Sequence, residues 1–250
     1  LMPTPPTRLP CSAAGIHATP PSRARRRAYL YGLGALALAL IYLGCRIALA
    51  GLADFQTRAF LADWENRRSP PSAKAWAVAH AAAERAVAHY PTAYGPYLER
   101  LGYVHAWQHH HAPFGAAHAQ PSRAAARDAF RAAIAARPTW PYAWLALAET
   151  KLRLLEFDAE FHHALTQAHA HAPWRPDINR RLAELGFTAW PQLDTGPRQA
   201  THEAARRALK RLNAASATAL FAQATTAGQR PALCRSLDEA TRTRLARHCS

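Results

Sequence analysis

The chain has 250 residues, half of them hydrophobic, with 31 Lys and Arg against 16 Asp and Glu. Abundant Ala and Arg and few strand formers predict an all-α domain large enough to bury a core, which excludes the β classes. The formal net charge of +15 would suit an anionic partner. The Arg residues are scattered over every expected helix, however, so we do not expect nucleic-acid binding. The four Cys are far apart and form no C-x-x-C pair, which excludes a zinc pattern.

The N-terminal part predicts a tail followed by a membrane anchor. Residues 1–22 carry six prolines and no periodicity, and an Arg cluster at 23–27 follows them. We expect residues 1–27 to be a disordered cytoplasmic tail. Residues 28–45 then hold no charge and would span about 27 Å as a helix, close to the ~30 Å apolar layer of a bilayer. We therefore predict a transmembrane signal anchor over residues 28–50.

The position of the Arg cluster predicts the orientation of this anchor. Positive residues before an apolar segment, with none clustered directly after it, place the N-terminus in the cytoplasm. The C-terminal domain would then be periplasmic, on the far side of a bacterial inner membrane. Cleavage after Ala48-Leu49-Ala50, a lipoprotein site at Cys45 and a buried core helix are the alternatives.

A repeat organises the middle of the chain. Small and large apolar residues stand five, eight and twelve positions before Pro173, and the same offsets recur before Pro138 and Pro91. These steps return to one face of a helix. A second helix is expected after each proline, with a large residue followed by Leu and then Ala or Gly. The predicted repeat core comprises Ala79, Ala83, Ala86, Leu101, Gly102, Ala126, Phe130, Ala133, Trp144, Leu147, Ala148, Phe161, Leu165, Ala168, Leu182 and Ala183.

This spacing resembles the tetratricopeptide repeat (TPR) superfamily over roughly residues 72–190. The resemblance implies a solenoid of helical hairpins over residues 51–195, with a groove for a peptide, a helix or a protein. The fold class that we predict is therefore an all-α, TPR-like helical-hairpin solenoid behind a single N-terminal transmembrane helix.

A His-rich insertion interrupts the repeat between residues 105 and 118. It holds His105, His109, His110, His111 and His118, and no Cys, Asp or Glu lies among them to complete a metal site. A solvated, pH-responsive loop is the interpretation that we prefer, with metal binding as the alternative. Its role stays open, and we predict no bound metal or cofactor.

The segment from Pro138 to Trp190 supports a narrower resemblance. Its Trp, Tyr, Phe and Pro residues are similar to those of the VpsP-type polysaccharide-biosynthesis proteins. Those are exported, membrane-anchored accessory proteins, and they imply no catalytic residue here. Trp140 and Trp174 follow helix-ending prolines closely, so they are candidates for contact with a partner or with sugar rings.

Residues 196–250 are expected to form a C-terminal helical cap after a linker at 191–200. Cys234 and Cys249 lie fifteen residues apart and flank a short helix. In an exported domain two such cysteines are expected to pair, with two free thiols as the alternative.

The motifs of common enzymes are missing outside the apolar segment, including G-x-S-x-G, H-E-x-x-H and the P-loop. We therefore predict a scaffold and not an enzyme, serving an envelope assembly for exopolysaccharide biosynthesis or export. The alternatives are a repeat adaptor for another envelope machine, such as pilus assembly or cytochrome maturation, and a basic, aromatic module that binds an acidic polysaccharide.

Overall fold

The computed structural model describes residues 23–249, and every regular element among them is helical. The predicted all-α class is confirmed. The chain divides into two compact units at Gly44 and Cys45. Residues 1–22 of the predicted tail lie outside the described residues.

Helix α1 (Arg23–Arg67) supplies all of the described first unit and the start of the second. Every side chain from residue 23 to residue 44 is exposed, although most of this stretch is apolar. Within residues 23–249, α1 is the one helix long and apolar enough to cross a membrane by length and composition.

The division between the two units falls inside α1. Among the described residues the helix begins at Arg23, so the Arg cluster forms its first turn. Arg46 donates to the carbonyl of Ala88 (2.6 Å) and Ala50 is fully buried, so both belong to the second unit. The apolar residues 28–44 belong to the first unit.

The second unit continues with eleven α-helices in the described chain. They are α2 (Ala73–His89), α3 (Gly95–Gln108), α4 (Gln120–Ala136), α5 (Pro141–Leu154), α6 (Ala159–His171), α7 (Pro176–Thr188), α8 (Thr195–Leu209), α9 (Ala214–Thr226), α10 (Arg230–Ser236), α11 (Glu239–Arg244) and α12 (Ala246–Cys249).

Local sequence explains where several of these helices begin. Proline occupies the first turn of α3, α4, α5 and α7, where a missing N–H leaves no hydrogen bond unmade. The hydroxyl of Ser72 caps α2, and the carboxylate of Asp158 caps α6. Ser122 lies inside α4, and its hydroxyl donates to the carbonyl of Ala119 (3.1 Å).

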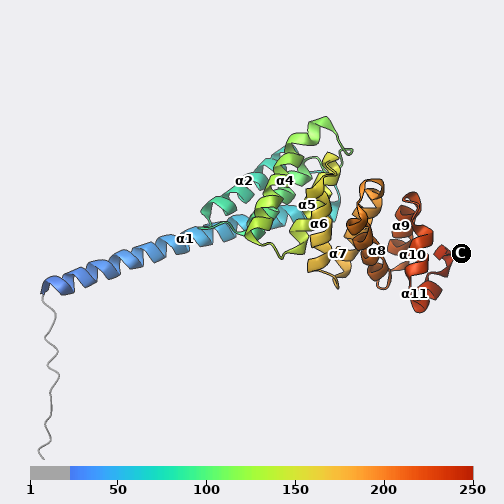
Figure 1. The fold of residues 1–250 in the computed structure, drawn as a ribbon. Coiled ribbons are helices and arrows are strands. Elements are labelled where there is room, and N and C mark those ends of the chain that lie inside the picture. The colour runs from blue at the N-terminus through green and yellow to red at the C-terminus, as the bar shows by residue number, and fades with distance from the viewer. Residues whose placement is uncertain (1–22, 250) are drawn as a thin grey trace, which may run out of the picture. The chain divides into compact units, whose positions relative to one another are not determined.

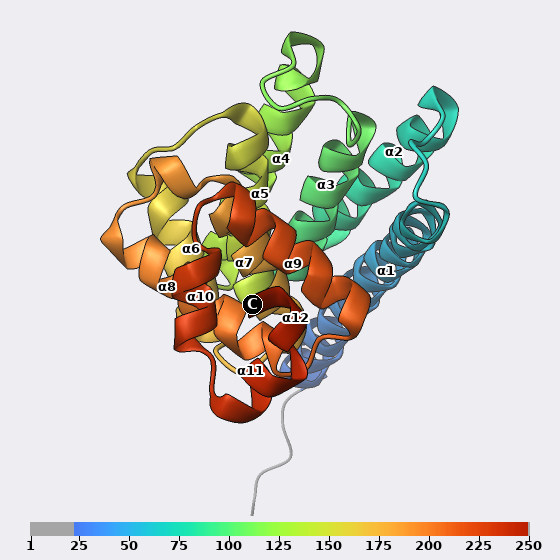
Figure 2. The same ribbon diagram turned by 90° about the vertical axis from the view of Figure 1, so that its right-hand side faces the viewer.

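From α2 to α8, helices adjacent in sequence are also neighbours in space (Figures 1 and 2). The closest pairs are α3 with α4, α5 with α6, and α7 with α8. Helices two apart also pack together, since α5 contacts α7, α6 contacts α8 and α7 contacts α9. From α5 to α7, each helix therefore packs against both the next helix and the one after it.

The residues predicted to form the repeat core lie in these contacts between helices. Among the predicted repeat-core residues, Leu101 and Trp144 are half-buried and the others are buried. Trp144 stays at the edge because its indole N–H donates to the carbonyl of Pro138 (2.7 Å), at the start of the hairpin.

The packing at Gly102 leaves no room for a side chain. A Cβ on Gly102 would lie 2.6 Å from Cε1 of Phe130, closer than carbon atoms approach in folded proteins. The helices α3 and α4 thus meet at this glycine.

We expect Gly102→Ala to lower the free energy of unfolding by about 1–3 kcal/mol, because the added methyl group overpacks the seam between α3 and α4. Chemical denaturation of the full chain in detergent measures this loss. Gly196→Ala is the matched control, because no atom lies within 4 Å of a Cβ there. A loss in the control as large as that in Gly102→Ala would contradict the explanation.

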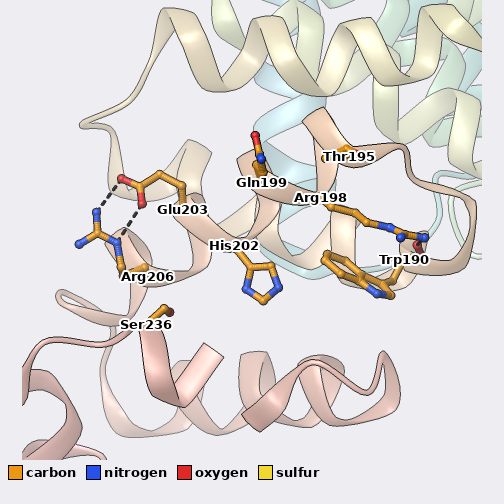
Figure 3. Close-up of a pocket in the computed structure, with 8 residues that line it drawn as sticks. All are labelled: Trp190, Thr195, Arg198, Gln199, His202, Glu203, Arg206 and Ser236. Carbon is orange, nitrogen blue, oxygen red and sulfur yellow. Dashed lines mark hydrogen bonds and ion pairs between the residues drawn. The ribbon is translucent and has the colours of Figure 1, made fainter. Parts of the chain in front are cut away.

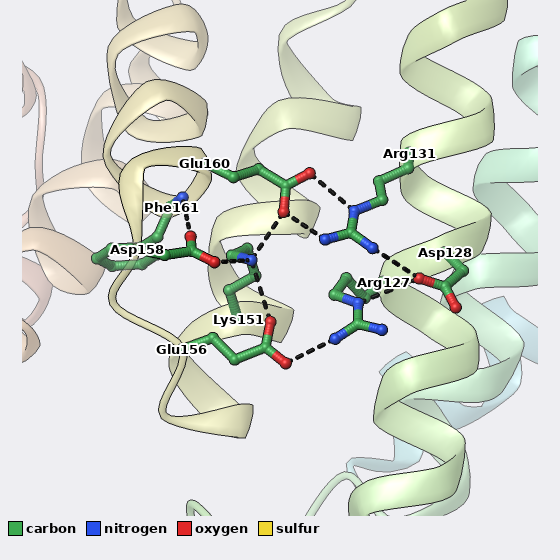
Figure 4. Close-up of polar contacts among 8 residues, drawn as sticks. All are labelled: Arg127, Asp128, Arg131, Lys151, Glu156, Asp158, Glu160 and Phe161. Carbon is green, nitrogen blue, oxygen red and sulfur yellow. Dashed lines mark hydrogen bonds and ion pairs between the residues drawn. The ribbon is translucent and has the colours of Figure 1, made fainter.

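A buried ammonium group joins α4, α5 and α6 (Figure 4). The side chain of Lys151 is fully buried, and its Nζ lies 3.0 Å from Glu156, 2.9 Å from Asp158 and 2.7 Å from Glu160. Arg127 and Arg131 of α4 bind Glu156 and Glu160 from the other side. The helices are therefore linked by alternating charges as well as by apolar contacts.

The C-terminal region also differs from the expected boundaries. Residues 191–200 were expected to be a linker, but α8 begins at Thr195 and packs against α6 and α7. The disulfide between Cys234 and Cys249 is confirmed, and it joins α10 to α12.

Candidate functional site

A groove of about 740 Å³ runs along helices α3, α5 and α7. Its lining comes mainly from the end of α1 and from α3, α5 and α7. The lining residues are Leu61, Glu65, Arg68, Glu99, Arg100, Tyr103, Ala106, Trp107, His110, His111, Phe130, Ala146, Glu149, Thr150, Arg153, Arg180 and Arg181.

Glu149 is the electrostatic centre of the groove. Its carboxylate accepts from Arg181 of α7 and from Arg153 of α5, the latter at 3.2 Å. Burial alone would raise the pKa of Glu149, but Arg181 and Arg153 outweigh burial and lower that pKa. The carboxylate therefore stays charged and holds two guanidinium groups in fixed positions along the groove wall.

A second acidic group lies on α3. Glu99 accepts from the indole N–H of Trp140 (2.9 Å), and burial raises the pKa of Glu99 despite that bond. Burial and the nearby Glu99 also raise the pKa of Tyr103, so its hydroxyl stays protonated. This wall thus offers a neutral hydroxyl beside a carboxyl group that is costly to ionise.

The His-rich insertion forms one end of the groove. Its residues His111 and His118 are exposed, as the expected solvated loop requires. Arg123 is buried beneath it and donates to the carbonyls of Ala112 (2.7 Å) and Pro113 (2.9 Å). Arg153 donates to the carbonyl of His110 (2.8 Å), whose ring stacks on Trp107 at 4.5 Å. Two arginines therefore fix the segment against the hairpins.

The imidazoles of the insertion do not converge on one point. His109 contacts His118, and His110 contacts His111, while His105 contacts His80 of α2. Across residues 23–249, no three His, Cys, Asp or Glu side chains come together in a way that could hold a metal ion.

His105 makes stability depend on pH. Burial, and then the neighbouring His80, lower the pKa of His105 to about 4. An unfolded His titrates near ~6.5, so between these pH values the unfolded chain binds a proton that the folded chain does not. The contribution of neutral His105 to the free energy of unfolding is therefore complete above pH ~6.5, and it is lost as the pH falls toward 4.

We therefore expect urea midpoints to fall between pH 7 and pH 5, and to fall less in His105→Gln. His163→Gln, which removes an exposed imidazole from α6, is the control and should keep the wild-type pH dependence. Identical pH profiles for His105→Gln and the wild type would contradict this account.

A second hollow of about 570 Å³ lies between α8 and the C-terminal helices (Figure 3). Trp190 forms its apolar wall, with the guanidinium of Arg198 5.3 Å from the ring centroid and His202 in edge contact at 5.1 Å. His202 also bonds the side chain of Gln229 (3.2 Å). Its arginine and histidine side chains Arg198 and His202 are thus held by contacts within the same region.

The two candidate contact tryptophans are in different environments. Trp140 is half-buried, its N–H is bound to Glu99 and Arg137 lies 3.9 Å from its ring centroid. Trp174 is 81% exposed and has Arg207 4.7 Å from its ring centroid. Neither lines the groove.

The sequence analysis missed the main polar residues of the groove, namely Glu149, Arg153 and Arg181. Glu149 and Arg181 are 32 positions apart, and no local pattern joins them. Both residues could have been found by counting from the proline at the start of their helices. That count would have placed Glu149 and Arg181 on the same side of neighbouring hairpins.

No model of a known protein family matches the chain, and a comparison with curated proteins finds no match. The structure therefore defines the protein by class. Over residues 23–249 it is an all-helical protein with an open polar groove, a C-terminal disulfide and one helix, near the N-terminus, long and apolar enough to cross a membrane.

Proposed function

We propose that the protein is a membrane-anchored, exported TPR-like scaffold that holds a partner protein in its groove. The observation that carries this proposal is the groove itself, which takes its walls from the equivalent helices α3, α5 and α7. In a stack of hairpins such a surface is continuous from one repeat to the next, and it suits an extended or helical segment.

The charges in the groove support a polypeptide occupant. The lining carries both signs, and Glu149 holds Arg153 and Arg181 in place before any partner arrives. Guanidinium groups held in this way lose little freedom on binding, and they present N–H donors to carboxylates and carbonyl oxygens.

The location is proposed from three features. The apolar stretch 28–44 is exposed, an Arg cluster precedes it, and the domain after it contains a disulfide. All three features fit a bacterial inner-membrane protein. Its anchor would have the positive end in the cytoplasm, and its oxidised domain would lie in the periplasm. The assignment to exopolysaccharide biosynthesis or export rests on the resemblance to the VpsP-type proteins.

Site-specific photocrosslinking in native membranes tests the groove. A benzophenone residue at Arg68 or His111, both in the lining, should give adducts with a protein of a polysaccharide export or synthesis complex. Ala135, exposed on α4 and outside the lining, is the control position. Equal adducts from Ala135 would contradict the groove, and adducts with pilus or cytochrome-maturation proteins would contradict the polysaccharide assignment.

A further inference from the structure

One edge of the second unit is formed by the turns α2–α3, α4–α5 and α6–α7. The chain enters the unit at this edge, because Arg46 donates to the carbonyl of Ala88 at the end of α2. The turns at this edge are joined by contacts, since a Cβ on Gly95 would lie 3.0 Å from Cβ of Arg137. We call residues 46, 90–97, 137–142, 173–177, 207, 210 and 211 the entry edge.

The first part of the entry edge is a tyrosine cluster. Tyr90, Tyr94 and Tyr97 contact one another with ring centroids 4.7 to 5.4 Å apart. Tyr94 is 40% exposed at the start of α3. Three rings with polar tips therefore lie next to the point where the chain enters the unit.

In the next turns of the entry edge, aromatic residues are paired with arginines. Arg137 lies 3.9 Å from the ring centroid of Trp140, and Arg175 lies 5.1 Å from that of Tyr142. Beyond them, Arg207 donates to the carbonyl of Pro173 (2.7 Å) and lies over the exposed ring of Trp174. Consecutive turns thus each present an aromatic ring with a guanidinium group beside it.

The charge of the entry edge is positive. Arg46, Arg137, Arg175, Arg207, Lys210 and Arg211 supply six cations. Of the acidic groups beside them, Asp177 is bound by Tyr142 and Arg175, Glu203 is bound by Arg207 (2.7 Å), and Asp238 is bound by Lys210. The six cations therefore outnumber these three carboxylates. An anionic partner would therefore meet an excess of basic groups.

We infer that the entry edge rests on the anionic headgroup layer of the membrane in which the chain is anchored. Trp and Tyr side chains favour the boundary between lipid and water, and basic side chains favour an anionic surface. The inference rests on the proposed anchoring, because the apolar stretch that ends at Gly44 would hold the first turn of the unit at the membrane surface. The groove would then keep a fixed height and direction above the bilayer.

Fluorescence quenching by lipid tests this placement in the full chain, reconstituted in nanodiscs with Cys11 and Cys45 replaced by Ala. A bimane label is attached at Thr92→Cys or Thr139→Cys, both exposed at the entry edge. His111→Cys is the control, because it lies beyond the far end of α3, whose 14 residues span about 21 Å. The quencher is a nitroxide on the lipid headgroup.

We expect quenching at positions 92 and 139 to exceed that at 111 several-fold in bilayers of phosphatidylglycerol and phosphatidylcholine. It should weaken in phosphatidylcholine alone and in the double variant Arg137→Glu, Arg175→Glu. Equal quenching at all three positions, or no dependence on lipid charge, would overturn the inference while leaving the anchor intact. Extraction of the wild-type chain from native membranes by carbonate would instead show that the proposed anchoring fails.

Discussion

We expect Lys151→Met to lower the free energy of unfolding by about 3 kcal/mol, near the low end for a broken buried ion pair. The variant removes the only ammonium group among Glu156, Asp158 and Glu160 and leaves three carboxylates facing one another. Arg127 and Arg131 still bind two of them, and all three carboxylates are partly solvated, which limits the loss. Equilibrium urea denaturation in detergent measures it.

Lys210→Met is the matched control for this prediction. Lys210 binds a single carboxylate, Asp238 at 2.7 Å, and both side chains are more than 40% exposed. An exposed pair of this kind contributes at most about 1 kcal/mol. If the two lysine variants lost equal stability, the buried cluster would not be what joins α4, α5 and α6.

We expect Phe130→Ala to cost about 3–5 kcal/mol, because it leaves a cavity where α3 meets α4. Phe130 is 1% exposed, its ring fills the space above Gly102, and Tyr103 meets it edge-on at 5.2 Å. The same ring forms part of the groove, so crosslinking from Arg68 should weaken as well. Denaturation and crosslinking on the same variant measure both effects.

Phe114→Ala is the control for Phe130→Ala. Phe114 lies in the His-rich insertion and is 46% exposed, so little buried area is lost when it is truncated. A cost near that of Phe130→Ala would contradict the view that the α3–α4 seam is the better-packed part of the domain.

Proline spacing made much of the fold predictable. A second helix was expected after Pro138 and after Pro173, and α5 and α7 begin three residues after them, at Pro141 and Pro176. Proline is well tolerated in the first turn of a helix, because its missing N–H has no partner there. Counting from the prolines also identified buried positions such as Phe161 and Leu165. Both signals come from residues that are close together in the chain, so they can be recognised in a single sequence.

The parts that sequence reasoning missed depend on distant contacts. Residues 191–200 contain Gly and Pro and suggested a linker, but Pro197 falls in the first turn of α8, where it is tolerated. The buried Arg123 reaches the insertion ten residues earlier and the end of α5 thirty residues later, and no periodicity marks it. The groove likewise depends on which hairpins lie next to one another.

The proposed function depends above all on which side of the membrane the domain occupies. The measurement is labelling of Cys234 and Cys249 with a membrane-impermeant maleimide in spheroplasts, with Cys11 and Cys45 replaced by Ala. We predict no labelling before reduction, because the two thiols form a disulfide, and full labelling after reduction by an impermeant phosphine. Labelling that requires lysis of the spheroplasts would place the domain in the cytoplasm and contradict the proposed function.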